Sequence, residues 1–210
     1  MPLTDFQVCD GDLPQAWLDE YLTAGQLAVD TETMGLVLHR DRLCLVQLCD
    51  EAGRVTMVRI PQGSREAPHL ATLLTAPQVE KVFHFARFDL GTLAVNLGIA
   101  VTPVFCTKIA SKLVRTYTNR HGLKDVIQEL CGVELDKSAQ SSDWGAVSEL
   151  SPQQLAYAAN DVRYLLAARH KLEAMLRREN RWPLAQRCFQ ALSTLVELDS
   201  QGFSGVFEHQ

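Results

Sequence analysis

The stretch Leu27-Ala28-Val29-Asp30-Thr31-Glu32 decides how the rest of the chain is interpreted, because an apolar run ends there in two carboxylates. Side chains of a strand alternate between its two faces, so Asp30 and Glu32 would lie on the same face. Neighbouring acids repel one another, and a divalent cation is the simplest compensation. The alternative is a strand end that leads into a solvated loop, and other parts of the chain must decide between the two.

The composition favours one globular domain. The chain has 210 residues, of which 47% are hydrophobic, enough for a single core. It contains no run of apolar residues long enough to span a membrane and no basic, apolar leader. The six cysteines form no CxxC pair and the six histidines show no zinc-type spacing, so we expect reduced thiols in a cytoplasmic protein.

The charge distribution restricts the kind of ligand. The net charge is −5, whereas a protein that grips long nucleic acid through many phosphates is usually basic. Residues 90–124, however, contain no Asp or Glu and include Lys108, Lys112, Arg115, Arg120 and Lys124. The sequence is therefore compatible with a short anionic ligand held by few contacts.

The order of the predicted elements indicates a mixed α/β domain. Apolar runs bounded by turn residues predict strands at Gln26–Thr31, Leu43–Cys49, Val55–Ile60, Lys81–Phe85 and Val101–Cys106, the first three forming an antiparallel meander. Helical periodicity and capping residues predict helices around Pro14–Leu22, Pro68–Leu74, Ala86–Asn96, Thr107–Val114, Leu123–Cys131, 152–178 and Leu184–Glu197.

Two further acids lie where they could join the first pair. Asp89 is in the first turn of the helix after the fourth strand. The alternative to a metal ligand is an acid that only stabilises the helix by interacting with its dipole. Asp161 follows Tyr157 by one helical turn, so the phenol and the carboxylate share a face. Its neighbours Ala158 and Val162 make a poor setting for a solvated acid.

Together these residues resemble the three-motif signature of DEDD-type 3′→5′ exonucleases, in the Tyr-x-x-x-Asp form typical of ribonuclease D. The resemblance narrows to the nanoRNase C family over most of residues 26–170. It is carried by Asp30–Leu36, His39–Cys44, Phe83–Leu90, Phe105–Leu113, Arg115–Lys124 and Ser141–Trp144. It implies a ribonuclease H-like exonuclease fold, a five-stranded mixed sheet flanked by helices. We expect one domain over residues 1–210, with a core at about 20–178 and a C-terminal helix at about 184–197.

The resemblance also implies the cofactors and the catalytic residues. Two divalent cations, Mg²⁺ or Mn²⁺, are expected, since hard oxygen ligands suit both ions. The predicted ligands are Asp30, Glu32, Asp89 and Asp161, with Asp30 bridging the two ions. Tyr157 has an ordinary pKa of about 10 and is predicted to orient the attacking water rather than to act as a free base.

The expected substrate is very short RNA, dinucleotides included, cleaved to nucleoside 5′-monophosphates. By resemblance Leu36 is a wedge against a base, although plain packing is equally compatible, and Trp144 could either stack on a base or pack. Basic and hydroxyl side chains are the candidates for binding a 5′ phosphate. The alternative interpretation of the basic residues is a helix face that is simply exposed to solvent. The predicted substrate-binding residues are Thr31, Leu36, His84, Arg115, Tyr117, Arg120, His121, Lys124, Ser141 and Ser142.

Two other functions stay open at this point. One is a broader ribonuclease D-like exonuclease that trims RNA 3′ ends or degrades DNA. The other is a nucleic-acid-binding module without catalysis, which the intact set of four acids and Tyr157 argues against. The expected partner is short single-stranded RNA, with DNA as an alternative, and the resemblance implies a homo-octamer.

Overall fold

The computed structural model describes residues 5–136, 142–203 and 205–207. Its strands are β1 (Gln7–Asp10), β2 (Gln26–Thr33), β3 (Leu43–Asp50), β4 (Val55–Arg59), β5 (Glu80–Phe83) and β6 (Val104–Cys106). Its helices are α1 (Gln15–Tyr21), α2 (Pro68–Thr75), α3 (Ala86–Leu97), α4 (Thr107–Val114), α5 (Leu123–Cys131), the 3₁₀ turn η1 (Val147–Glu149), α6 (Pro152–Arg163), α7 (Leu165–Arg178), α8 (Trp182–Gln190) and α9 (Leu192–Ser200).

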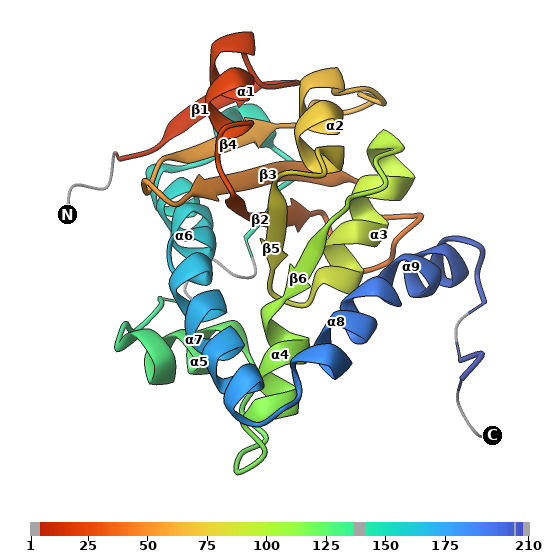
Figure 1. Cartoon of the computed structure of the whole chain (residues 1–210). Coiled ribbons are helices and arrows are strands. Elements are labelled where there is room, and N and C mark those ends of the chain that lie inside the picture. Colours follow the sequence, from red (N-terminus) through yellow and green to blue (C-terminus); the bar gives the residue numbers. More distant parts are fainter. Residues whose placement is uncertain (1–4, 137–141, 204, 208–210) are drawn as a thin grey trace.

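The strands form one mixed sheet in the order β1-β4-β3-β2-β5-β6 (Figure 1). The meander of β2, β3 and β4 is antiparallel as predicted, and β5 and β6 join it in parallel. The sheet has six described strands rather than the expected five, because Gln7–Asp10 pairs in parallel with β4. That short edge strand is partly exposed and has no apolar alternation, so its sequence pattern does not reveal it.

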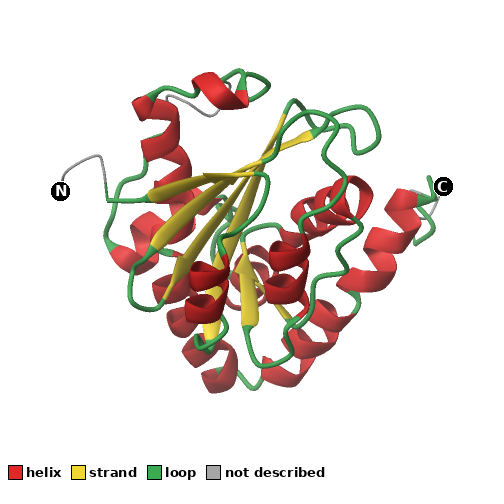
Figure 2. Cartoon of the chain, turned by 90° about the horizontal axis from the view of Figure 1, so that it is seen from above, coloured by secondary structure: helices red, strands yellow, loops and turns green. Residues whose placement is uncertain are grey.

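Every residue of β3 is buried, and helices surround the sheet (Figure 2). The helix α6 packs on β2, β3 and β4, while α3 contacts β2, β3, β5 and β6 and is itself covered by α9. This arrangement encloses the end of β2 that carries the two acids. Among the described residues, no helix combines the length and apolar character that a bilayer crossing requires.

The C-terminal helices are more divided than the sequence predicts. The helix expected over 152–178 stops at Arg163 and resumes at Leu165, and the one expected over 184–197 is split at Ala191 into α8 and α9. Neither break contains a proline or a glycine, the residues that mark helix ends in a sequence. The start at Pro152 is as predicted, because Ser151 and Gln154 form a capping box.

Candidate active site

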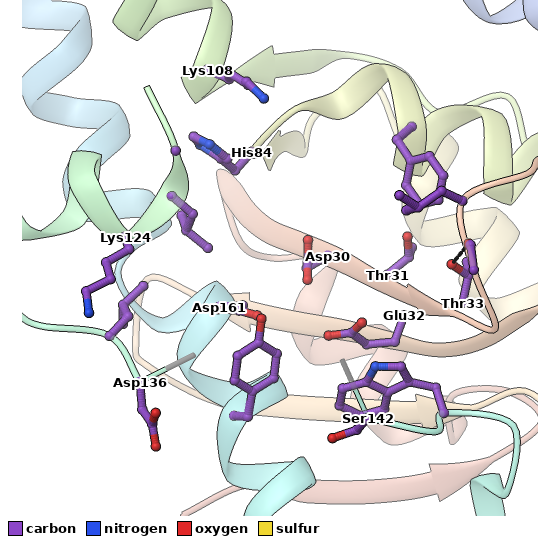
Figure 3. A pocket seen from close by; sticks show the side chains of 18 of the residues that line it. Asp30, Thr31, Glu32, Thr33, His84, Lys108, Lys124, Asp136, Ser142 and Asp161 are labelled. Carbon is purple, nitrogen blue, oxygen red and sulfur yellow. Dashed lines mark hydrogen bonds between the residues drawn. The ribbon is translucent and has the colours of Figure 1, made fainter. Parts of the chain in front are cut away.

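Three of the predicted acids converge at the end of β2. One carboxylate oxygen from each of Asp30, Glu32 and Asp161 lies within 4.8 Å of the others. Figure 3 shows these side chains turned toward the same space, two from the strand and one from α6. The alternation along β2 places Asp30 and Glu32 on the face that α6 covers, and Asp161 meets them there.

Asp89 stands beside this group rather than within it. Its carboxylate accepts a 2.7 Å hydrogen bond from the hydroxyl of Thr31, whose side chain leaves the opposite face of β2. Asp89 is 4% exposed, and its charge contributes to raising the pKa of Asp30. The fourth predicted acid therefore approaches the cluster from α3, held by the strand residue between the other two.

The acids repel one another and are poorly solvated. Burial, followed by the charges of Asp89, Asp161 and Glu32, raises the pKa of Asp30 well above its usual range. Burial and the charges of Asp161 and Asp89 raise the pKa of Glu32 to about 9, and burial raises the pKa of Asp89 to about 7. No described Lys or Arg forms an ion pair with these three acids.

This donor set fits a divalent cation. All the ligand atoms are carboxylate oxygens, which suit Mg²⁺ and Mn²⁺ better than softer metals. Carboxylates that repel one another and are largely removed from water are costly, and a bound cation would reduce both the repulsion and the desolvation penalty. The three clustered acids, Asp30, Glu32 and Asp161, belong to the set predicted from the sequence to bind metal.

Tyr157 lies next to the cluster and keeps its proton at neutral pH. Its pKa is raised by burial and then by the charges of Asp161 and Glu32 and a hydrogen bond to Asp161. Its ring packs against Trp144, with the ring centroids 6.2 Å apart. Trp144 is only 3% exposed, which supports a packing role. The phenol is therefore protonated in the metal-free chain and can donate a hydrogen bond.

A cleft of about 630 Å³ opens over the acids. Nine predicted site residues line it: Asp30, Thr31, Glu32, Leu36, His84, Lys124, Ser142, Tyr157 and Asp161. Leu36 is 81% exposed on a turn in which the Asp41 carboxylate accepts the Val37 backbone N–H. A Cβ at Gly35 would lie 2.4 Å from the Asp41 carboxylate, so a larger residue there would displace the side chain that holds this turn.

The two lysines of the cleft differ in their partners. Lys124 Nζ lies 3.2 Å from a carboxylate oxygen of Glu134, whereas Lys108 Nζ lies 4.1 Å from the centroid of the Phe85 ring. Phe85 is half exposed and has left-handed backbone angles, a conformation that costs free energy in a non-glycine residue. Lys108 was not among the predicted substrate-binding residues, and its place in the acid-free stretch 90–124 was the only sequence signal for it.

His84 contributes a neutral ring to the cleft wall. Its Nδ1 lies 2.9 Å from the hydroxyl oxygen of Thr107. Burial and then the charge of Lys108 lower the pKa of His84 to about 3, so the imidazole carries no charge at neutral pH. It can hydrogen-bond to a ligand but adds nothing to the attraction for phosphate.

Four predicted phosphate contacts lie away from the cleft. Arg115 is 1% exposed, and its guanidinium donates to Glu129, to the Ser111 hydroxyl and to a backbone carbonyl. Tyr117 donates to the same Glu129, and the remaining two are engaged in Arg120–Asp125 and His121–Ser111 contacts. These contacts fix the loop that brings Lys124 to the cleft wall. Ser141 lies outside the described residues.

The comparisons with known proteins agree with this geometry. A family model described as a 3′–5′ exonuclease matches residues 7–177, so the chain belongs to the 3′–5′ exonuclease family. Ribonuclease D of Acidiphilium cryptum is 34% identical over 155 residues, 74% of this chain and 39% of that protein. DNA polymerase I of Aquifex aeolicus is 40% identical over 150 residues, 71% of this chain and 24% of that protein. The chain thus spans about two fifths of the length of the ribonuclease D relative.

Solved structures narrow the position within the family. Brucella melitensis NrnC with bound Mg²⁺ is 46% identical, with a TM-score of 0.90 and 98% of each chain covered. The same protein bound to pGG is 47% identical, with a TM-score of 0.91 and the same coverage. This similarity extends over the whole fold and places the chain in the NrnC group of ribonuclease D-type exonucleases. The resemblance predicted from the motifs is confirmed.

Proposed function

We propose that this chain is a metal-dependent 3′–5′ exoribonuclease that hydrolyses very short RNA, dinucleotides included, to nucleoside 5′-monophosphates. The observation that carries the proposal is the convergence of Asp30, Glu32 and Asp161, with Asp89 beside them, under one cleft that Tyr157 borders. The relatives support it, because NrnC structures contain Mg²⁺ in one case and pGG in another.

Asp30, Glu32, Asp89 and Asp161 would hold two divalent cations, Mg²⁺ or Mn²⁺. Bound there, the cations would make the attacking water more acidic and neutralise the charge on the leaving 3′ oxygen. Tyr157, still protonated, would donate its hydrogen bond to the attacking water and fix its direction. Lys108 and Lys124 would contact the phosphates from the other walls of the cleft (Figure 3).

Three features favour a short substrate. A cleft of about 630 Å³ is comparable with small-molecule pockets, and the exposed Leu36 stands at its edge as a candidate wedge. The net charge of −5 also disfavours a long phosphate track. A broader exonuclease acting on RNA 3′ ends or on DNA is the second candidate, favoured by the ribonuclease D and DNA polymerase I similarities.

The decisive experiment measures release of nucleoside monophosphate from a dinucleotide with Mg²⁺, with Mn²⁺ and with EDTA. We expect activity with either metal, none in EDTA and none in the Asp30→Ala variant. Rates on 5′-labelled RNA and DNA oligomers of two to ten nucleotides separate the two candidates. A sharp preference for two RNA nucleotides supports the first, whereas equal rates across lengths support the second.

We also infer a homo-octamer and a cytoplasmic location. The octamer comes from the family resemblance, and light scattering of the purified chain tests it. All six cysteines are free, including the buried Cys44, Cys49 and Cys106, which suits a reducing compartment.

A further inference from the structure

Gln47 is a buried amide without a hydrogen-bond partner. Its side chain is fully buried in β3, and neither Nε2 nor Oε1 has a partner within the described residues. A buried polar group that forms no hydrogen bond lowers stability, and an apolar side chain of the same shape would avoid that loss. Few such groups persist in native proteins, so each one calls for an explanation.

The sheet register places Gln47 directly opposite Asp30. Residues that face each other in an antiparallel pair point to the same side of the sheet, with Cβ atoms about 4.5–5.5 Å apart. On its other side Gln47 faces Met57, which offers no hydrogen bond to an amide of this kind. The residue directly across from Gln47 on β2 is therefore Asp30, a carboxylate acceptor on the same face, with Glu32 on the diagonal.

The acids of the site differ in how their orientation is fixed. The Thr31 hydroxyl donates to Asp89, and the Tyr157 phenol lies beside Asp161, one turn away on α6. No described side chain donates a hydrogen bond to Asp30, although this is the acid predicted to contact both cations. A partly buried acceptor without a described side-chain donor thus lies opposite a buried donor without an acceptor, on the face of the sheet that α6 covers.

We propose that Gln47 is a positioning residue for Asp30, whose amide Nε2–H donates to the Asp30 carboxylate, directly or through one buried water, when the site holds its cations. The hydrogen bond would leave the second carboxylate oxygen and the remaining lone pairs directed at the cations. Residues that orient metal ligands in this way contribute strongly to metal affinity. The inference rests on the proposed function, because it assumes that Asp30 is a metal ligand.

The test is Mn²⁺ binding to the full chain by titration calorimetry. Gln47→Met keeps the length of the side chain and removes both polar atoms. We expect Mn²⁺ to bind about 10-fold or more weakly, in the range typical of lost ligand-orienting contacts. In EDTA we expect the thermal midpoint to stay unchanged or to rise, since an unpaired amide has been removed. If Gln47→Met does not fold, Gln47→Leu serves for the same titration.

The matched control is Leu48→Met, at the next position of β3 on the opposite face and equally buried. It introduces the same side chain into the core without touching the face of the acids, so its Mn²⁺ affinity should equal that of the wild type. A loss of less than threefold in the Gln47 variant would overturn the inference. If the wild-type chain binds no Mn²⁺, both the proposed function and the role of Gln47 are wrong. If the wild type binds Mn²⁺ and the Gln47 variant binds it equally well, only the role of Gln47 is wrong.

Discussion

Replacing Glu32 by Gln tests whether the acids are held together against their own repulsion. Two unit charges 4.8 Å apart repel by about 3 kcal/mol at an effective dielectric constant of about 20. Because partial protonation of the acids already reduces this repulsion, we expect Glu32→Gln to stabilise the metal-free protein by about 2 kcal/mol at alkaline pH. For a chain of this size, that gain raises the thermal midpoint by about 4–8 °C.

The direction of the pH dependence follows from the pKa of Glu32. Burial and the neighbouring acids raise that pKa from 4.5 to about 9 in the folded chain. A group with a raised folded pKa contributes stability fully below its unfolded pKa and loses it as the pH rises through the folded value. Wild-type stability in EDTA should therefore fall between pH 5 and pH 9 more steeply than that of Glu32→Gln, so the advantage of the variant grows with pH.

The assay is thermal unfolding at several pH values, in EDTA and with Mn²⁺. Added Mn²⁺ should raise the midpoint of the wild type, because a ligand that binds only the folded state stabilises it, and should raise that of Glu32→Gln much less. Glu66→Gln, an exposed site far from β2 in sequence, is the control and should behave as wild type. The reasoning is refuted if Glu32→Gln is less stable than wild type at pH 9, or if Mn²⁺ raises its thermal midpoint as much as that of the wild type.

Three further substitutions test individual roles. Tyr157→Phe should lose most turnover but keep its Mn²⁺ affinity, since the phenol directs the attacking water without holding metal; near-normal turnover would remove it from the mechanism. Leu36→Ala should change stability by less than about 0.5 kcal/mol, because the side chain is 81% exposed, yet lose the preference for dinucleotides over longer oligomers. Arg115→Met should lower urea stability by about 1–3 kcal/mol by removing the buried guanidinium that donates to Ser111 and Glu129, with the KM of the folded variant unchanged.

The local patterns were strong enough to predict most of the elements. Apolar runs located β2 to β5, and the Ser151–Pro152 start of α6 followed from capping chemistry. The edge strand β1 was missed because four residues that pair with one neighbour need no apolar alternation. The break at Tyr164 was missed because nothing in the local sequence interrupts the helical pattern there.

In the candidate site, too, the local pairs of residues were predictable from the sequence and the distant contacts were not. Strand alternation and helical spacing paired Asp30 with Glu32 and Tyr157 with Asp161, since both pairs are local in the chain. The cationic residues could not be sorted by sequence, because what separates Arg115 from Lys124 is the partner that each one meets. The guanidinium of Arg115 is buried and donates its hydrogen bonds within the fold, whereas the side chain of Lys124 lines the cleft.

The sequence by itself predicted which residues would carry the chemistry, because Asp30 and Glu32 are two apart in a strand, Tyr157 and Asp161 are four apart in a helix, and each spacing puts a pair on one face. Only the tertiary structure decided which distant side chains meet them. It set Gln47 across the sheet from Asp30, Thr31 against Asp89, and Lys108 over the ring of Phe85. Those contacts depend on strand register and helix packing, which are fixed by the core as a whole rather than by any local stretch.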